Sequence, residues 1–161
     1  FGAFGGRTDI MDMYDPTRPG SLPHAGTFNN NVLSMAAGST ALSNVFPPQT
    51  AETLHGRGEA LRGRLNDLFQ HHGVALCASG MGSLMNIHPV AGPVETMDDL
   101  ADADDRIKEL LFLDLLERGY YIARRGFIAL SLAVTDADLD GFVTALDEVV
   151  TVRKPLLPGR N

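Results

Sequence analysis

The sequence feature that most constrains the fold is an amphipathic pattern between residues 50 and 72. Apolar residues recur there at the spacing of one face of an α-helix. That face consists of Leu54, Leu61, Leu65, Leu68 and Phe69. A helix with such a stripe buries it against other elements, because water solvates large apolar side chains poorly. The pattern therefore predicts a packed domain built around a helix from Thr50 to His72.

The segments that follow predict a small α+β domain. Short apolar segments predict strands at residues 74–78, 83–88, 120–123 and 127–132. Residues 102–117 predict a second helix, and Thr135 with Asp138 forms the pattern of a capping box that opens a last helix. Because strands and helices do not alternate strictly, this order favours an α+β arrangement.

The first 46 residues differ in character from the rest. The opening Phe-Gly-Ala-Phe-Gly-Gly-Arg is typical of the end of a buried strand followed by a tight turn. We expect the neighbours of this strand to precede residue 1, so that the chain is the C-terminal part of a longer protein. Residues 7–13 predict a short helix, and residues 30–46 a longer one with Asn29 or Asn30 as its N-cap. Pro47-Pro48 marks the expected boundary between residues 1–46 and residues 47–161.

The charge balance argues against two classes of partner. Thirteen Lys and Arg stand against 20 Asp and Glu among 161 residues, a formal net charge of −7. Neither nucleic acid nor an anionic membrane surface attracts a net anion. No apolar stretch of the sequence approaches the roughly 20 residues of a membrane-spanning helix. We expect a cytoplasmic protein that binds neither nucleic acid nor a membrane.

Metal and covalent chemistry find little support in the sequence. Cys77 is the one cysteine, which excludes a cage of several cysteines, and the histidines share no ligand spacing with it. We therefore expect no metal site. Of the lysines, Lys108 is expected on a solvated helix face and Lys154 in the tail, so neither is expected to form a Schiff base.

Two segments carry residue types suited to binding anions. Gly-Thr-Phe-Asn-Asn-Asn at residues 26–31 precedes a predicted helix, whose N-terminal N–H groups favour phosphate beside the Thr27 hydroxyl. A plain loop with an asparagine cap explains the same residues. Arg124 and Arg125 lie between two predicted strands, and an arginine there suits a carboxylate because of its planar fork. Two surface arginines are the alternative, and the residues alone leave both questions open.

In this order along the chain, three segments resemble class III pyridoxal-phosphate aminotransferases. The segments are residues 2–7, 25–38 and 130–140. These enzymes have fold type I, and the group includes glutamate-1-semialdehyde 2,1-aminomutase. The similarity is strongest to β-amino-acid aminotransferases of the β-phenylalanine type, through residues 29–33 and 125–127. The resemblance implies an α/β fold of type I, in which residues 1–46 end the large cofactor-binding domain with its linking helix and residues 47–161 form the small C-terminal α+β domain.

The resemblance also implies which residues bind ligands. In this family the Schiff-base lysine precedes the segment at residues 2–7, so no catalytic residue is expected in this chain. Thr27, with the backbone around Phe28, is implied to bind the phosphate of pyridoxal 5'-phosphate that belongs to the neighbouring subunit of a homodimer. Arg125 is implied to hold the substrate carboxylate. Strand alternation then predicts Arg124 on the opposite face, at the surface.

The implied activity moves the amino group of a β-amino acid, such as β-phenylalanine, to 2-oxoglutarate or pyruvate, once an N-terminal segment of the same protein completes the site. Glutamate-1-semialdehyde 2,1-aminomutase activity is an alternative. The mutases usually have Gly-Asn-Pro where this chain has Asn30-Asn31-Val32, and they lack an arginine at the Arg125 position. Both differences favour transamination. A non-catalytic member of the family is the second alternative.

Overall fold

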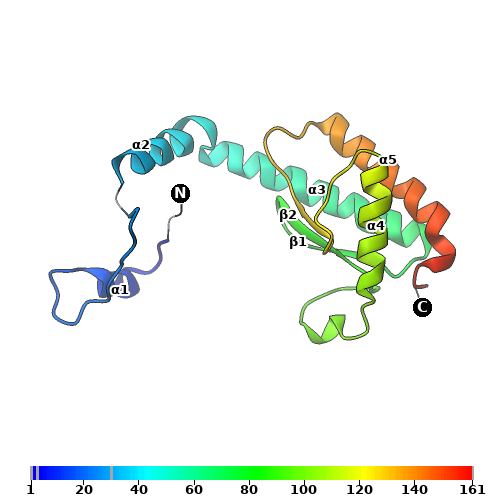
Figure 1. Ribbon diagram of the computed structural model, residues 1–161, viewed down its shortest axis with the longest axis horizontal. Helices are drawn as coiled ribbons and strands as arrows, with labels where there is room; N and C mark the ends of the chain where they lie inside the picture. The colour runs from blue at the N-terminus through cyan, green and yellow to red at the C-terminus, as the bar shows by residue number, and fades with distance from the viewer. Residues whose placement is uncertain (1, 3, 30, 161) are drawn as a thin grey trace. The chain divides into compact units, whose positions relative to one another are not determined.

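The computed structural model describes residues 2, 4–29 and 31–160, and it divides into two compact units (Figure 1). The units are Phe1–Thr50 and Ala51–Asn161. None of the helices in the described part of the chain is long and apolar enough to cross a membrane.

The first unit contains two short helical segments. Helix α1 (Thr8–Met11) continues into the 3₁₀ turn η1 (Asp12–Tyr14), and helix α2 (Val32–Thr40) continues into the π-helical turn η2 (Ala41–Val45). Both predicted helices are thus confirmed.

The cap of α2 lies one position after the expected ones. Asn31 has extended backbone angles, and its Oδ1 accepts a hydrogen bond of 3.1 Å from Ser34 N. Asn29 instead closes a turn, because its N–H donates to Gly26 O. The prediction of Asn29 was therefore wrong, and Asn30, the other expected cap, lies outside the described residues. Neighbouring asparagines share the same capping chemistry, so backbone conformation decides between them.

The strand end expected at the start of the chain is not found in the structure. Residues 2 and 4–7 are exposed and form no strand, while Phe1 and Ala3 lie outside the described residues. A strand depends on ladder hydrogen bonds to a neighbour, and no described segment pairs with residues 4–7. The ring of Phe4 packs instead against those of Tyr14 and His24, at centroid distances of 5.3 and 4.9 Å.

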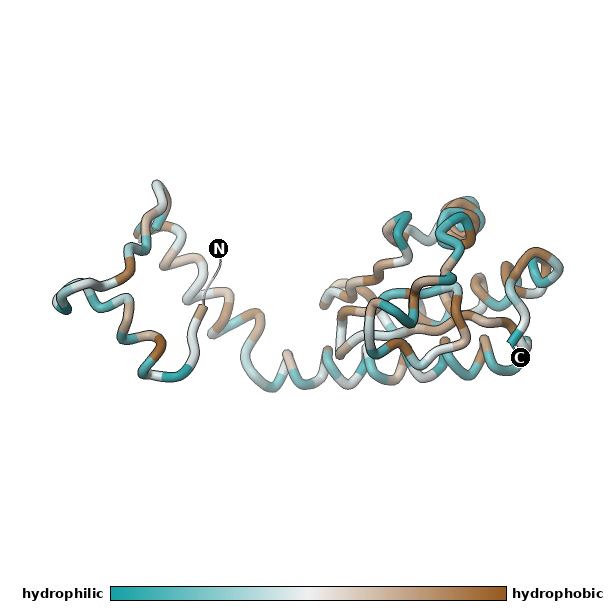
Figure 2. The backbone as a smooth tube through the Cα atoms, turned by 90° about the horizontal axis from the view of Figure 1, so that it is seen from below, coloured by the Kyte–Doolittle hydropathy of each residue, from teal (hydrophilic) through white to brown (hydrophobic). Residues whose placement is uncertain are grey.

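The second unit packs three helices and a three-stranded antiparallel sheet around one core. The elements are α3 (Pro48–His72), β1 (Cys77–Met81), β2 (Leu84–His88), η3 (Asp98–Leu100), α4 (Asp105–Glu117), β3 (Phe127–Ala129), α5 (Asp136–Arg153) and η4 (Lys154–Leu156), and the first three residues of α3 still belong to the first unit. The sheet order is β1-β2-β3, and its inner face buries Ala78, Met85, Ile87 and Ile128. Hydrophilic and hydrophobic residues alternate along the helices of this unit, as Figure 2 shows. The apolar stripe predicted for α3 is confirmed as part of the core.

The strand predictions hold only where a partner strand is present. Val74 forms a single bridge with Gly159, so β1 begins at Cys77 rather than at residue 74. Residues 120–123 form no strand: Tyr120 N donates to Leu115 O and Ala123 N donates to Phe127 O, and neither bond belongs to a ladder with a partner strand. The last helix begins as predicted: Thr135 Oγ1 accepts from Asp138 N, and Asp138 Oδ2 accepts from Thr135 N.

A close contact between two glycines seats the β1–β2 hairpin on α3. A Cβ at Gly58 would overlap the carbonyl oxygen of Gly82, so only glycine allows this approach. Glu59, the next residue of α3, accepts a hydrogen bond of 2.7 Å from Gly82 N. The hairpin position therefore depends on glycine at position 58.

We predict that Gly58→Ala lowers the free energy of unfolding by about 1–3 kcal/mol, because the added methyl group overpacks the contact. Gly56→Ala is the matched control on the same helix, where an added Cβ meets no atom within 4 Å. It should raise stability by about 0.5–1 kcal/mol through helix propensity alone. Urea denaturation followed by circular dichroism measures both, and equal effects of the two substitutions would contradict the close contact.

Candidate functional site

Arg124 and Arg125 lie in a tight turn directly before β3. Gly126 N donates to Ala123 O at 2.8 Å, and Ala123 N donates to Phe127 O at 3.0 Å. Gly126 has a φ of +85°, and a Cβ there would lie 2.6 Å from Ile87 O, so the position requires glycine. Ile87 N in turn donates to Gly126 O at 3.0 Å. These bonds hold the turn against β2.

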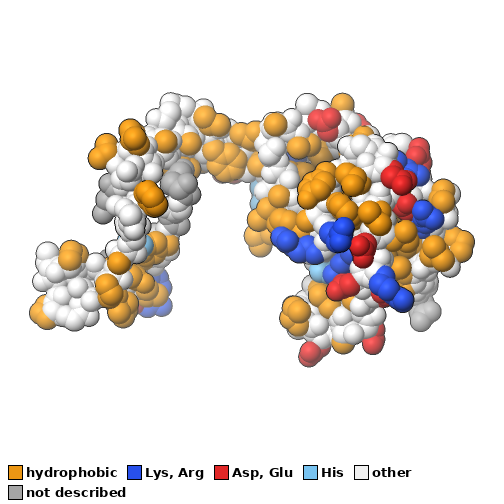
Figure 3. Space-filling view, viewed as in Figure 1, with side chains coloured by type: hydrophobic (Ala, Val, Ile, Leu, Met, Phe, Trp, Pro, Cys, Tyr) orange, Lys and Arg blue, Asp and Glu red, His pale blue; other side chains and the backbone are white. Residues whose placement is uncertain are grey.

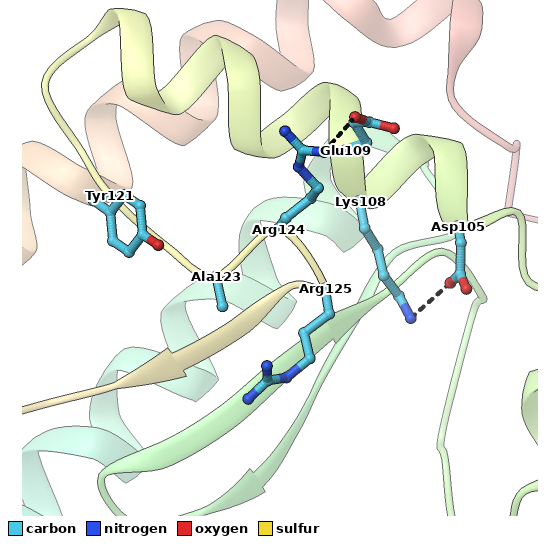
Figure 4. A pocket seen from close by; sticks show the side chains of 7 residues that line it. All are labelled: Asp105, Lys108, Glu109, Tyr121, Ala123, Arg124 and Arg125. Atoms are coloured by element: carbon cyan, nitrogen blue, oxygen red, sulfur yellow. Dashed lines mark ion pairs between the residues drawn. The ribbon is translucent and has the colours of Figure 1, made fainter.

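This turn corrects the argument from strand alternation. The two arginines do not belong to a strand, because residues 120–123 are irregular and β3 begins at Phe127. Their side chains nevertheless point in different directions (Figure 4). The turn, and not a pleated strand, separates them.

Helix α4 holds the side chain of Arg124. Arg124 Nη1 lies 3.3 Å from Glu109 Oε1, and the guanidinium carbon lies 5.5 Å from the centre of the Phe112 ring. The Arg124 side chain is 67% exposed. Its charge is thus engaged by α4 at the surface of the unit.

Arg125 has a different environment. Its guanidinium carbon lies 5.2 Å from the centre of the Phe127 ring. Within the described part of the chain, no carboxylate forms an ion pair with it, whereas Lys108 and Arg124 nearby each have one. Arg125 is therefore the cation of this region that is available to a carboxylate from outside the chain.

A cavity of about 510 Å³ lies beside the turn (Figure 4). It is lined by Asp105, Lys108, Glu109, Tyr121, Ala123, Arg124 and Arg125. Cations outnumber carboxylates in this lining, although the whole chain is acidic. Basic and acidic side chains also lie next to each other on the face of this unit that Figure 3 shows. An open cavity with this charge balance suits a small anion.

The environment of Lys108 differs from the one expected from the sequence. Its side chain is only 14% exposed, although a solvated position was expected, and its Nζ lies 2.9 Å from Asp105 Oδ1. A lysine stem packs readily along an apolar surface while its charge reaches a polar edge. Sequence reasoning also missed Asp105 and Glu109 as part of the cavity. The available signal was their helical spacing, which puts residues 105, 108 and 109 on one face of α4.

A buried histidine lies at the end of β2. His88 is 8% exposed, and its Nε2 lies 2.9 Å from Ser79 Oγ. Burial lowers the pKa of His88, the charge of Lys108 lowers it further, and Asp105 opposes this shift. Its Nδ1 is buried and has no hydrogen-bond partner among the described residues. This environment favours the neutral imidazole.

The lowered pKa of His88 predicts a pH dependence of folding. The unfolded chain takes up a proton near the ordinary pKa of about 6.5, and the folded chain only at lower pH, so acid favours unfolding. The contribution of neutral His88 to the free energy of unfolding should be fully present above that pH. Below it, the free energy of unfolding should fall by at most about 1.4 kcal/mol per pH unit for this one proton. Denaturation at pH 7.5 and 5.5 should show a smaller difference for His88→Gln than for the exposed control His71→Gln. Equal differences for the two variants would exclude His88 as the source of the pH dependence.

Thr27 and Phe28 lie in an exposed loop of the first unit, before α2. Asn29 N donates to Gly26 O at 3.0 Å, and Asn31 N donates to Phe28 O at 3.2 Å, so two turns follow each other. The Thr27 hydroxyl is exposed and makes no hydrogen bond with the described residues. Phe28 is 79% exposed. Thr27 and Phe28 are thus adjacent in one loop, and Arg125 belongs to the other unit.

Comparison with known proteins gives a consistent result. No protein-family model matches the sequence. The β-phenylalanine transaminase of Variovorax paradoxus is 51% identical over 100% of this chain and 37% of its own length. The crystal structure of a β-phenylalanine aminotransferase from the same organism superimposes with a TM-score of 0.89, at 50% identity, over 98% of this chain and 36% of the other. This chain is a homologue of aminotransferases.

A more distant relative represents the alternative activity. The glutamate-1-semialdehyde 2,1-aminomutase 2 of Staphylococcus saprophyticus is 29% identical over 93% of this chain and 35% of its own length. The chain therefore spans about a third of the curated relatives that it matches, and it corresponds to their C-terminal part. The expected family resemblance and the expected fold class are confirmed.

Proposed function

We propose that this chain is the C-terminal part of a pyridoxal-phosphate-dependent aminotransferase. The enzyme would move the amino group of a β-amino acid, aromatic like β-phenylalanine, to 2-oxoglutarate or pyruvate. The structural observation that carries the proposal is Arg125, an arginine without a carboxylate partner in the described chain, in a cavity with an excess of cations. The 51% identity to a β-phenylalanine transaminase supports the same substrate class.

In this proposal Arg125 binds the substrate carboxylate. Its planar fork can donate two parallel hydrogen bonds, which fixes both the position and the orientation of the bound acid. Lys108 and Arg124 are paired with the two carboxylates of the same lining, so the charge of Arg125 is left in excess and favours an anion. Holding the carboxylate places the amino group of the substrate at a defined distance from it, so the clamp orients the reacting end.

The loop of Thr27 fits the phosphate of pyridoxal 5'-phosphate. The Thr27 hydroxyl and the N–H of Phe28 make no hydrogen bond with the described residues, so both are available as donors to an anion. Placing the phosphate there orients the ring of the cofactor. When bound, the cofactor supplies an electron sink for the carbon that loses its proton. We propose that the Schiff-base lysine belongs to a preceding segment.

The same proposal includes the assembly. We propose a cytoplasmic homodimer in which the Thr27 loop of one subunit serves the cofactor of its neighbour. Residues 1–46 would end the large domain and its linking helix, and residues 47–161 would form the small domain. Large apolar side chains next to Thr27 support a partner surface there, because Phe28, Val32 and Leu33 are 78–79% exposed.

The aminomutase is the second candidate, and it is less well supported. The aminomutase relative is 29% identical to this chain, against 51% for the transaminase. Conversion of glutamate semialdehyde without any keto-acid acceptor would favour the mutase. A non-catalytic protein would follow if the complete protein lacked a Schiff-base lysine.

We predict that Arg125→Ala in the full-length enzyme raises KM for β-phenylalanine about 100-fold, because charge-assisted hydrogen bonds to the carboxylate are lost. The visible absorbance of the bound cofactor should not change. Arg64→Ala is the control, since Arg64 pairs with Asp140 outside the cavity lining. Steady-state kinetics measures KM, and an unchanged value for Arg125→Ala would contradict the assigned role.

We predict that Thr27→Val in the full-length enzyme weakens cofactor binding about tenfold or more, because valine keeps the shape and removes one hydrogen bond to the phosphate. Reconstitution of the apoenzyme, followed by visible absorbance, gives the dissociation constant. Thr144→Val removes an exposed hydroxyl that bonds to Asp140 O on α5 and should leave that constant unchanged. Equal dissociation constants for Thr27→Val and the wild type would exclude Thr27 from the phosphate site.

A further inference from the structure

The segment that leads to Arg125 is fixed from two sides. On one side Gly126 O accepts from Ile87 N of β2 at 3.0 Å. On the other side the Phe112 ring of α4 contacts both ends of residues 121–124: the Tyr121 ring at a centroid distance of 5.9 Å and the Arg124 guanidinium at 5.5 Å. Glu109, one turn earlier on α4, adds the ion pair to Arg124. The backbone next to Arg125 is thus held between a strand and a helix.

Helix α4 is a rigid support for this contact. Its opposite face is deeply buried, since Leu111 and Leu115 are 1% and 0% exposed. Phe112 itself is 9% exposed. An interaction with Glu109 and Phe112 therefore ties Arg124 to the core of the unit and limits how far the turn can move.

We propose that Glu109 is a positioning residue: by holding Arg124 against α4, it keeps the turn in the conformation that presents Arg125 to the substrate carboxylate. This inference rests on the proposed function, because it assigns a role relative to Arg125. Glu109 itself does not contact the substrate in this proposal. It acts through Arg124 and the backbone that the two arginines share.

The ion pair is a weak contributor to global stability, which makes the role testable. The side chains of Arg124 and Glu109 are 67% and 49% exposed, and exposed pairs contribute little to the free energy of unfolding. Removal of Glu109 should therefore leave the fold intact. Its effect should fall on the orientation of the turn.

An effect of charge alone and an effect on positioning would change the affinity for an anion in opposite directions. Glu109 is one of two carboxylates in the cavity lining, with Asp105 as the other. Neutralising either one makes the cavity more positive, so simple electrostatics predicts tighter binding of an anion in both cases. Positioning predicts weaker binding for Glu109→Gln only, because Asp105 pairs with Lys108 and not with the turn.

The experiment compares Glu109→Gln with Asp105→Asn in the full-length holoenzyme. It measures kcat and KM for β-phenylalanine. Calorimetry adds the dissociation constant of 3-phenylpropanoate, which keeps the carboxylate and lacks the amino group. We expect Glu109→Gln to raise KM and the dissociation constant about three- to tenfold with kcat within about twofold, and Asp105→Asn to lower both constants. Arg124→Lys keeps the charge but loses the planar contact with Phe112, and it should weaken binding in the same direction as Glu109→Gln.

The outcomes separate this inference from the proposed function. If Glu109→Gln tightens binding as Asp105→Asn does, or leaves it unchanged, the positioning role is overturned. A loss of kcat without a change in KM overturns it as well. If Arg125→Ala raises KM while Glu109→Gln does not, only the positioning role fails. If Arg125→Ala has no effect, the proposed function fails together with this inference.

Discussion

The geometry of the cavity depends on one backbone constraint, the contact of Gly126 with β2. Gly126 adopts a φ of +85°, and its would-be Cβ lies 2.6 Å from Ile87 O and 2.7 Å from Asn86 Oδ1. A residue with a side chain cannot occupy this place without moving the turn away from the sheet. Because the turn lies so close to β2, the preceding residues reach α4, and Arg124 and Arg125 leave the backbone in different directions. The arrangement of the cavity therefore depends on the absence of a side chain at Gly126 as well as on the charged side chains.

Helix α4 connects this site to the core of the second unit. One face of the helix buries Ile107, Leu111 and Leu115, and residues on another face line the cavity. Asp114 fixes the helix against α5: it is 6% exposed, and Arg153 Nε and Nη2 donate to its two carboxylate oxygens at 2.7 and 2.8 Å. These bonds keep the pKa of Asp114 low, since a buried carboxylate is stable as an anion only with such donors. Packing and ion pairing together thus set the wall of the cavity.

The sequence was informative where local patterns determine structure. The apolar spacing of α3 and the capping box of α5 act within a few residues, and both predictions are confirmed. The strand expected at residues 120–123 was wrong, because a strand forms only beside a partner and the sequence does not show which segments meet. Arg125 was identified from a resemblance, and its role stays a prediction. The helical spacing of Glu109 with Asp105 and Lys108 indicates a shared helix face, but it does not show that this face lines a cavity, because that depends on how α4 packs beside a turn 15 residues later.

The two units differ in how far they bury their own apolar side chains. The second unit has a continuous apolar core, so the arrangement around Arg125 is determined within this chain. In the first unit, Gly38 is the one buried residue of α2 among those described, and Val32 and Leu33 at its start are largely exposed. A nine-residue helix with exposed apolar side chains gains little stability by itself. In our proposal the neighbouring subunit buries this surface next to Thr27. On this reasoning the carboxylate site that we propose at Arg125 would be formed within one folded unit, whereas the phosphate site that we propose at Thr27 would depend on assembly.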